Sequence, residues 1–239
     1  MNLFSKNAKL KSLLDNLHLE NEKQLIFQAR SQFNGTDEEF QELLAKYNVY
    51  NPIEKGKLLE EYKIKIQSEE LALSVSSEMG LFLFSTAMIA KPKIILELGS
   101  SIGVSTLYFA EALRQLNNDG YVIATELSKK KCDIIQKNAE SSGLDRYIKI
   151  FQGNVFDTIK NINEKADIAF IDIWTSGYLD IFKAIRHLLK TGSIFIADNM
   201  FSAGKDAVPF KEYLDKDETV HNITLDFESG VEYGIILQQ

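Results

Sequence analysis

Acidic and amide side chains follow two apolar segments in the second half of the chain. Asp172 follows the run 168–171, and Asp198 with Asn199 follows the run 193–197. If these runs are neighbouring parallel strands, the three side chains meet at one edge of a sheet. Carboxylate and carboxamide oxygens, without histidine or thiolate, favour Mg²⁺, Mn²⁺ or Ca²⁺ over zinc or copper. The pattern predicts a divalent-cation site, and the alternative is a turn that Asp198 and Asn199 close by hydrogen bonds to the backbone.

A glycine-containing turn, "ELGSSIGVS", follows another apolar segment, residues 94–98. Gly99 and Gly103 allow the backbone to pass close to a ligand, and Ser101 or Ser105 can cap the helix that follows. A dinucleotide site requires G-x-G-x-x-G, but Ser101 stands where the second glycine belongs. The turn therefore predicts a ligand site of another kind, although any tight connection between strand and helix needs glycine.

Residues at three strand ends favour a nucleoside that carries a positive charge. Glu97 would oppose a phosphate, but it suits S-adenosylmethionine, which has an ammonium and a sulfonium group. Glu126 ends the next apolar segment, where a doubly wound sheet holds ribose hydroxyls. After the third segment come a glycine that permits close approach and three residues that can border an adenine ring: Gly153, Asn154, Val155 and Phe156. A strand-end acid is common at a surface, but the three positions together predict a binding site for S-adenosylmethionine.

Five short apolar segments alternate with helical segments from residue 93 onward. The strands are expected at "IILEL", "YVIATE", "YIKIF", "DIAFID" and "SIFIAD", with intervening helices from Thr106, Lys130, Phe156 and Tyr178. This alternation predicts an α/β fold in which helices cover both faces of a doubly wound parallel sheet. Two further strands in residues 219–238 are separated only by residues 228–230. They predict a C-terminal antiparallel hairpin, and hence a mixed sheet.

The first 75 residues are predicted to form a helical N-terminal extension to a catalytic domain at residues 76–239. Thr36 and Glu39 have the spacing of a capping box, and the Asn51–Pro52 pair predicts a further helix start. We expect these helices to cover the acceptor site or to form part of a dimer interface, and we expect the protein to be a homodimer.

The composition is that of an ordinary globular protein. The chain has 239 residues, of which 45% are hydrophobic and 26% charged, and its net charge is −7. This charge argues against a nucleic acid as partner. Cys132 is the only cysteine, which excludes an intramolecular disulfide and favours a packed thiol in a reducing compartment. No apolar run reaches the ~18 residues of a membrane span, so we expect a soluble cytoplasmic protein.

Motifs at four strand ends resemble the cation-dependent O-methyltransferases of the catechol and caffeoyl-CoA type. They include "LELGSSIGVSTLYFA", "FIDIWTSGYL" and "ADNMFSAGK", and with the hairpin "ESGVEYGIIL" the resemblance covers roughly residues 76–239. It implies the Rossmann-like fold of class I methyltransferases. It also implies that Glu97 and the 99–103 loop hold the methionine part of S-adenosylmethionine, and that Glu126 binds its ribose. Trp174 corresponds to a tryptophan beside the cofactor.

The resemblance also implies a role for the oxygen ligands. Asp172, Asp198 and Asn199 match the positions that bind a divalent cation, which chelates two adjacent oxygens of the acceptor. Thr175 departs from the family, which usually has a lysine there as general base, three residues after the metal-binding aspartate. Threonine cannot accept a proton at neutral pH as an amine can. The proton is therefore expected to leave to solvent or to another residue, such as Lys205.

These observations predict an S-adenosylmethionine-dependent O-methyltransferase with a divalent cation, for which Mg²⁺ is the first choice. Its acceptor is expected to be a small catechol-like ring or vicinal diol. One alternative is methylation of a hydroxylated tRNA base, which the acidic composition disfavours. Another is a cofactor-binding protein without transferase activity, for which Thr175 is the only support.

Overall fold

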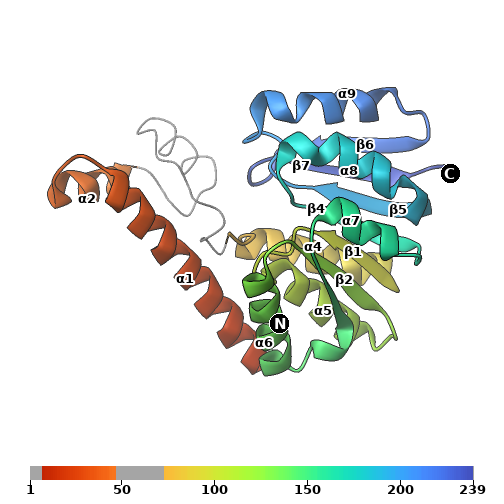
Figure 1. The fold of residues 1–239 in the computed structure, drawn as a ribbon, viewed down its shortest axis with the longest axis horizontal. Coiled ribbons are helices and arrows are strands. Elements are labelled where there is room, and N and C mark those ends of the chain that lie inside the picture. The colour runs from red at the N-terminus through yellow and green to blue at the C-terminus, as the bar shows by residue number, and fades with distance from the viewer. Residues whose placement is uncertain (1–6, 47–72, 239) are drawn as a thin grey trace.

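A seven-stranded sheet forms the centre of the computed structural model, which describes residues 7–46 and 73–238 (Figure 1). The strand order is β3-β2-β1-β4-β5-β7-β6. The five strands β1 to β5 are mutually parallel, whereas β7 runs antiparallel to both β5 and β6. The sheet is therefore mixed, with the C-terminal hairpin that the sequence predicts. The strands are β1 Ile94–Leu98, β2 Tyr121–Glu126, β3 Ile148–Gln152, β4 Ala166–Ile171, β5 Leu189–Ala197, β6 Val220–Leu225 and β7 Val231–Ile236.

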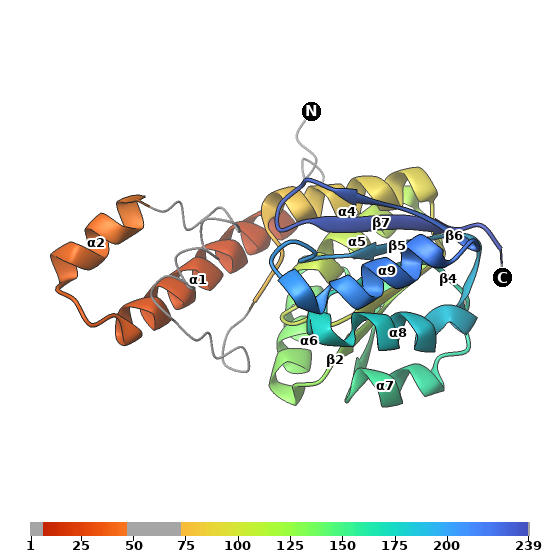
Figure 2. The ribbon, with the colours of Figure 1, turned by 90° about the horizontal axis from the view of Figure 1, so that it is seen from above.

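Helices cover both faces of this sheet (Figure 2). Helices α4 and α5 lie on one face, α8 and α9 lie on the other, and α6 and α7 connect β2 to β3 and β3 to β4. Each of the four predicted helices begins at the expected residue or at most two residues before it. The helices of this part are α4 Ser77–Ala90, α5 Val104–Leu116, α6 Lys129–Ser142, α7 Val155–Thr158, α8 Tyr178–Ile185 and α9 Val208–Lys216. Short 3₁₀ turns are η1 Asp145–Tyr147, η2 Ile159–Asn161, η3 Thr175–Gly177, η4 Arg186–Leu188 and η5 Gly204–Asp206.

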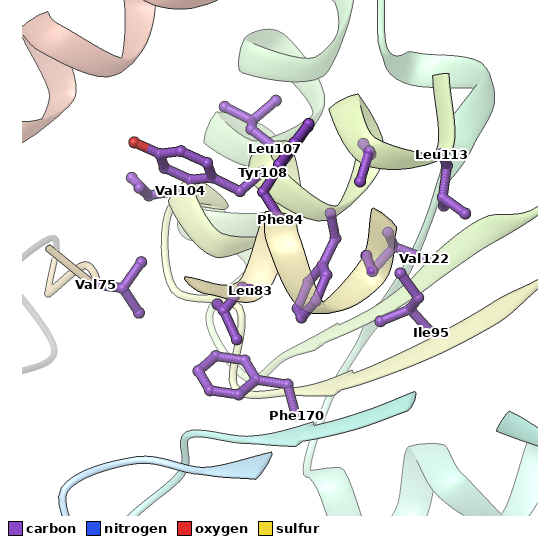
Figure 3. Close-up of a cluster of buried hydrophobic side chains, with 14 of the residues drawn as sticks. Val75, Leu83, Phe84, Ile95, Val104, Leu107, Tyr108, Leu113, Val122 and Phe170 are labelled. Carbon is purple, nitrogen blue, oxygen red and sulfur yellow. The ribbon is translucent and has the colours of Figure 1, made fainter. Parts of the chain in front are cut away.

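The central strands are apolar on both faces because both faces are covered. In β4, Ile168 and Phe170 point into the cluster beneath α4 and α5, while Ala169 and Ile171 point into the opposite cluster. Figure 3 shows the first cluster, in which Phe170 lies below residues of α4 and α5. The ring of Phe109 meets that of Phe170 edge to face, with centroids 6.0 Å apart. This packing holds the strands rigidly, and with them the turns that follow their carboxyl ends.

The first turns of the N-terminal helix α1 (Ala8–Gln32) share this core. Leu10 and Leu14 are buried in the same cluster as α4 and α5. The rest of α1 and helix α2 (Asp37–Lys46) extend away from the sheet (Figures 1 and 2) and bury a small cluster of their own. Thr36 and Glu39 form the predicted capping box, since each backbone amide donates to the other side chain. The predicted helix start at Asn51–Pro52 lies outside the described residues.

The cysteine and the helices bear on the expectations from composition. Cys132 is buried in α6, and burial raises the pKa of its thiol, as expected of a packed side chain. Of the helices in the described ranges, none is at once long and apolar enough to cross a membrane.

Candidate cofactor and cation site

Four turns are held side by side at the carboxyl edge of the sheet. The backbone amides of Gly99, Gly153, Asp172 and Asp198 each donate to the end of a neighbouring strand, at 3.2, 2.9, 2.9 and 3.2 Å respectively. The hydrogen-bond ladder of the sheet therefore continues into the turns after β1, β3, β4 and β5. This arrangement brings together the predicted site residues that follow these strands.

Glu97 is fully buried at this edge, although it is an acid. Its Oε2 accepts hydrogen bonds from the hydroxyl of Ser100, at 2.7 Å, and from that of Thr106. Its Oε1 is buried without a hydrogen-bond partner among the described residues. Burial raises the pKa of Glu97, the hydroxyls of nearby residues oppose this rise, and the charge of Glu126 adds to it. The Ser105 hydroxyl is the largest of the opposing influences on this pKa, yet it does not reach hydrogen-bonding geometry with Oε1. Oε1 can therefore accept from a ligand that brings a positively charged donor, such as an ammonium group.

Ser100 and Thr106 were not among the predicted site residues. Glu97 faces the same side of β1 as Ile95, because side chains alternate along a strand, and α5 brings Thr106 to that side. Had the burial of Glu97 been known, hydroxyl or amide donors near it could have been expected, since a buried acid needs them. The sequence does not show, however, that Glu97 is buried.

The glycine turn differs in part from the expectation. Gly99 has φ +93°, and a Cβ there would lie 2.3 Å from the backbone oxygen of Asp172. At Gly99 the backbone therefore passes close to the turn after β4, whereas the prediction was a close approach to a ligand. The prediction that Ser101 or Ser105 caps α5 is wrong, because Gly103 is the N-cap residue and no side chain caps the helix. Ser105 lies in the first turn of α5 beside Glu97, and the Ser101 hydroxyl is buried with no hydrogen-bond partner in the described part of the chain.

Glu126 ties two neighbouring elements together. Its Oε2 accepts from the backbone amide of Ser101 at 2.9 Å, and its Oε1 accepts from that of Ser128 at 2.8 Å. The carboxylate thus joins the glycine turn to the N-terminus of α6 while keeping lone pairs for further donors. Beyond β3, Gly153 has φ +138°, and Asn154 accepts from the backbone amide of Phe156 at 2.9 Å. Asn154 is exposed and Val155 is half-buried.

Asp172, Asp198 and Asn199 come together as predicted. The amide Nδ2 of Asn199 donates to Asp172 Oδ1 at 3.3 Å, and its backbone amide donates to Asp198 Oδ1 at 2.7 Å. Asn199 has φ +62°, a left-handed conformation that asparagine tolerates. Within the described ranges, no three His, Cys, Asp or Glu side chains are arranged to hold a metal ion. The present cluster has two carboxylates and one amide.

The electrostatics of this cluster favour a cation. Burial raises the pKa of Asp172 well above its usual range, and the charges of Asp198 and Glu97 raise it further. Only the hydrogen bond from Asn199 opposes the shift. A divalent ion between these oxygens would remove the repulsion, because it offsets the charge of both carboxylates. The chemistry of the three side chains therefore fits a hard cation that prefers oxygen ligands.

Ser229 also belongs to this cluster, although it was not predicted. Its hydroxyl lies 3.1 Å from Asp198 Oδ1 and 3.1 Å from Asn199 Oδ1. From the other side, the hydroxyl of Tyr178 donates to the backbone oxygen of Asp198 at 3.0 Å. Ser229 lies in the turn between β6 and β7, and the pairing of β7 with β5 brings that turn to the site.

The remaining predicted residues lie around the site without contacting its carboxylates. Trp174 is 73% exposed; the ring of Phe201, which was not among the predicted site residues, is 49% exposed. Thr175 is half-buried at the start of η3, and Lys205 is exposed in η5. Within the described structure, no hydrogen bond or ion pair joins the side chain of Thr175 or Lys205 to Asp172.

Comparison with known proteins identifies similar chains. A family model described as O-methyltransferase matches residues 50–231. The catechol O-methyltransferase of Niastella koreensis is 33% identical over 138 residues, which cover 56% of this chain and 61% of that protein. The catechol O-methyltransferase B of Danio rerio is 28% identical over 172 residues, which cover 69% of this chain and 62% of that protein. The chain thus spans about three fifths of the length of these curated relatives.

Solved structures share the fold. The O-methyltransferase from Bacillus cereus, in complex with SAH, matches with a TM-score of 0.65 and 22% identity over 79% of this chain and 99% of that one. The SAH-bound methyltransferase from Podospora anserina matches with a TM-score of 0.65 and 21% identity over 85% of this chain and 98% of that one.

Proposed function

This chain belongs to the O-methyltransferase family, and we propose that it transfers a methyl group from S-adenosylmethionine to a hydroxyl oxygen with the help of a divalent cation. One observation carries the proposal. The buried Oε1 of Glu97, which has no hydrogen-bond partner among the residues that the structure describes, lies at the same edge of the sheet as the oxygen cluster of Asp172, Asp198 and Asn199. The proposed site for a cationic donor and the proposed site for a hard cation are therefore at the ends of neighbouring strands.

The residues of the glycine turn would bind and orient the methyl donor. When bound, S-adenosylmethionine supplies a methyl group on a positively charged sulfur. Glu97 Oε1 would accept from its ammonium group, and the Glu126 carboxylate would accept from ribose hydroxyls. Glu126 is well placed for this role because backbone amides on two elements hold it in position.

Asp172, Asp198 and Asn199 would hold the cation. When bound, a divalent ion lowers the pKa of a coordinated hydroxyl and fixes its position. Chelation by adjacent oxygens favours a catechol-like ring or a vicinal diol as acceptor. Trp174 and Phe201 support an aromatic acceptor, since each is an exposed aromatic ring two residues beyond a proposed ligand, Asp172 or Asn199.

The proton of the acceptor hydroxyl would leave to solvent or to Lys205. Thr175 cannot take it at neutral pH. Lys205 is exposed and lies six residues beyond Asn199, so it belongs to the segment that borders the oxygen cluster. The acidic net charge of −7 supports a small-molecule acceptor over a tRNA.

Methyl transfer to catechol, followed with labelled S-adenosylmethionine, tests this proposal. We expect EDTA to abolish transfer and Mg²⁺ or Mn²⁺ to restore it. Asp198→Ala should abolish transfer, because it removes a cation ligand, whereas Asp133→Ala on the exposed face of α6 should leave it unchanged. Full activity in EDTA would exclude the cation. Binding of NAD instead of S-adenosylmethionine, measured by calorimetry, would overturn the whole proposal.

A further inference from the structure

We propose that Ser229 is a positioning residue for two cation ligands, Asp198 and Asn199, because its hydroxyl can hydrogen-bond to the Asn199 amide in either orientation of that amide. This inference rests on the proposed cation-dependent function. It concerns a residue of the β6–β7 turn, distant in sequence from both ligands.

The contacts of the Ser229 hydroxyl carry the proposal. Ser229 is only 6% exposed, and its Oγ lies 3.1 Å from one side-chain oxygen of Asp198 and 3.1 Å from that of Asn199. The hydroxyl has one hydrogen, so it donates to Asp198 or to Asn199 at any moment. Because the hydroxyl is buried, water competes little for either hydrogen bond. The Ser202 hydroxyl also approaches Asn199 Oδ1, at 3.3 Å, but Ser202 is exposed and has no hydrogen bond to Asp198 in the described structure.

The turn that carries Ser229 is itself anchored. The backbone oxygen of Ser229 accepts from the amide of Phe201 at 2.7 Å, and that of Gly230 accepts from the amide of Met200 at 2.9 Å. A Cβ on Gly230 would lie 2.7 Å from the backbone nitrogen of Phe201, so the two loops touch directly. Glu228 accepts a hydrogen bond from the hydroxyl of Ser76, the N-cap of α4, at 2.7 Å. Ser229 therefore occupies a fixed position relative to the ligands.

The chemistry of a hydroxyl suits this position. In the structure, Asn199 turns its Nδ2 towards Asp172 and its Oδ1 towards Ser229. A cation bound by both Asp172 and Asn199 requires the Asn199 Oδ1 to face Asp172, because the NH₂ group of an amide donates hydrogen bonds and does not coordinate a metal ion. After a half-turn of the amide, Nδ2 would donate to the Ser229 oxygen, and the Ser229 hydrogen would then be donated to Asp198 alone. Serine can thus partner the amide in both orientations, whereas alanine can partner it in neither.

Binding of MnCl₂ to the full chain, measured by calorimetry and by the electron paramagnetic resonance signal of free Mn²⁺, tests the inference. We expect Ser229→Ala to weaken Mn²⁺ binding by about 10- to 100-fold, as loss of a residue behind a metal ligand does. Ser229→Thr keeps the hydroxyl and should bind within about threefold of the wild type, since the hydroxyl supplies the effect. Ser193→Ala is the matched control, because it removes another buried serine hydroxyl, in the middle of β5, which donates to the backbone oxygen of Ala166 at the start of β4, and it should leave Mn²⁺ affinity unchanged.

The outcomes separate this inference from the function on which it rests. Wild-type affinity in Ser229→Ala would overturn the role of Ser229 and leave the proposed cation intact. Equal losses in Ser229→Ala and Ser229→Thr would assign the effect to packing of the turn and would also overturn it. Absence of Mn²⁺ binding by the wild type would overturn both proposals. Thermal unfolding should show similar losses in Ser229→Ala and Ser193→Ala, so that only the former changes metal affinity.

Discussion

Among single residues, the site brings together carboxylates that are partly or fully buried. Glu97 and Asp172 lie at the ends of adjacent strands, and the pKa of each is raised first by burial and then by neighbouring carboxylates. Such an arrangement costs stability unless a cation offsets it. A cationic ligand and a metal ion would each do so, which links the stability of the protein to its ligands.

Glu97→Gln should change how stability depends on pH. The folded state raises the pKa of Glu97 above its ordinary value of 4.5, so the native protein binds this proton more tightly than the unfolded chain. The resulting stabilisation is fully present below about pH 4.5 and is lost as the pH rises through the folded pKa. The free energy of unfolding of Glu97→Gln, minus that of the wild type, should therefore increase between pH 4.5 and 8.

Urea unfolding at several pH values measures this difference, and Glu140→Gln on the exposed face of α6 provides the baseline. The same Glu97→Gln variant should bind S-adenosylmethionine more weakly, because the neutral amide loses the attraction to the ammonium group. If the free energy of unfolding of Glu97→Gln, minus that of the wild type, stays constant or decreases with rising pH, the raised pKa of the buried Glu97 is contradicted.

Thr175→Lys should accelerate methyl transfer to a simple catechol if the site merely lacks a base. A positioned general base contributes about 10²- to 10⁴-fold, and the gain should be largest below the pKa of the acceptor. Steady-state kinetics over a range of pH measures it. If Lys205 already serves as the base, the new lysine should slow the reaction or leave it unchanged, and Lys205→Ala should lower kcat without weakening cofactor binding. Insensitivity of kcat to both substitutions would leave solvent as the proton acceptor.

At the scale of elements, α1 has two unlike halves. Its first turns bury Leu10 and Leu14 against the core of the sheet, whereas its second half shares a small cluster with α2 in the described part of the chain. Short isolated helices are marginal in water, so the first half takes its stability from tertiary contacts. The helix should therefore unfold together with the sheet.

Leu10→Ala and Leu14→Ala should each lower the free energy of unfolding by about 2–5 kcal/mol, because each leaves a cavity in the core. Leu10 is 0% exposed and Leu14 2%, whereas Phe27 on the same helix is 76% exposed. Phe27→Ala should change the free energy by only about 0.5 kcal/mol or less. Urea unfolding followed by circular dichroism measures all three. Equal small effects would show that α1 does not belong to the cooperative unit.

At the scale of the whole molecule, the sheet and the N-terminal helices depend on each other. The described part of α1 covers apolar surface beside α4, α5 and α6. We propose that residues 1–75 cover the acceptor site or take part in a homodimer interface. Analytical ultracentrifugation of the full chain tests the dimer directly.

Deletion of residues 1–75 should expose the apolar surface that Leu10 and Leu14 cover. We expect the shortened chain to aggregate, or to bind the acceptor more weakly, because exposed apolar patches drive association. Light scattering and methyl transfer to catechol measure the two effects. A shortened chain that is monomeric, free of aggregates and fully active would show that the helices are dispensable.

The sequence alone determined the elements of the sheet and most of the proposed site. The limits of β1 and β2 are those predicted, because strands buried on both faces appear as continuous apolar runs. Strand β5 begins at Leu189, four residues earlier than predicted. The prediction missed these four residues because most of them are polar and exposed. The rule that parallel strands end at one edge was sufficient to bring Asp172, Asp198 and Asn199 together.

Which residues support these side chains depends on how distant elements pack together. The strand order places β7 between β5 and β6, and this pairing carries Ser229 across 30 residues of sequence to Asn199. The contact of Gly99 with Asp172, and the hydroxyls that bind Glu97, likewise depend on how the strands and helices pack. Local sequence patterns report whether a residue is buried within its own element, whereas contacts between distant elements depend on strand order and packing, which no short pattern encodes.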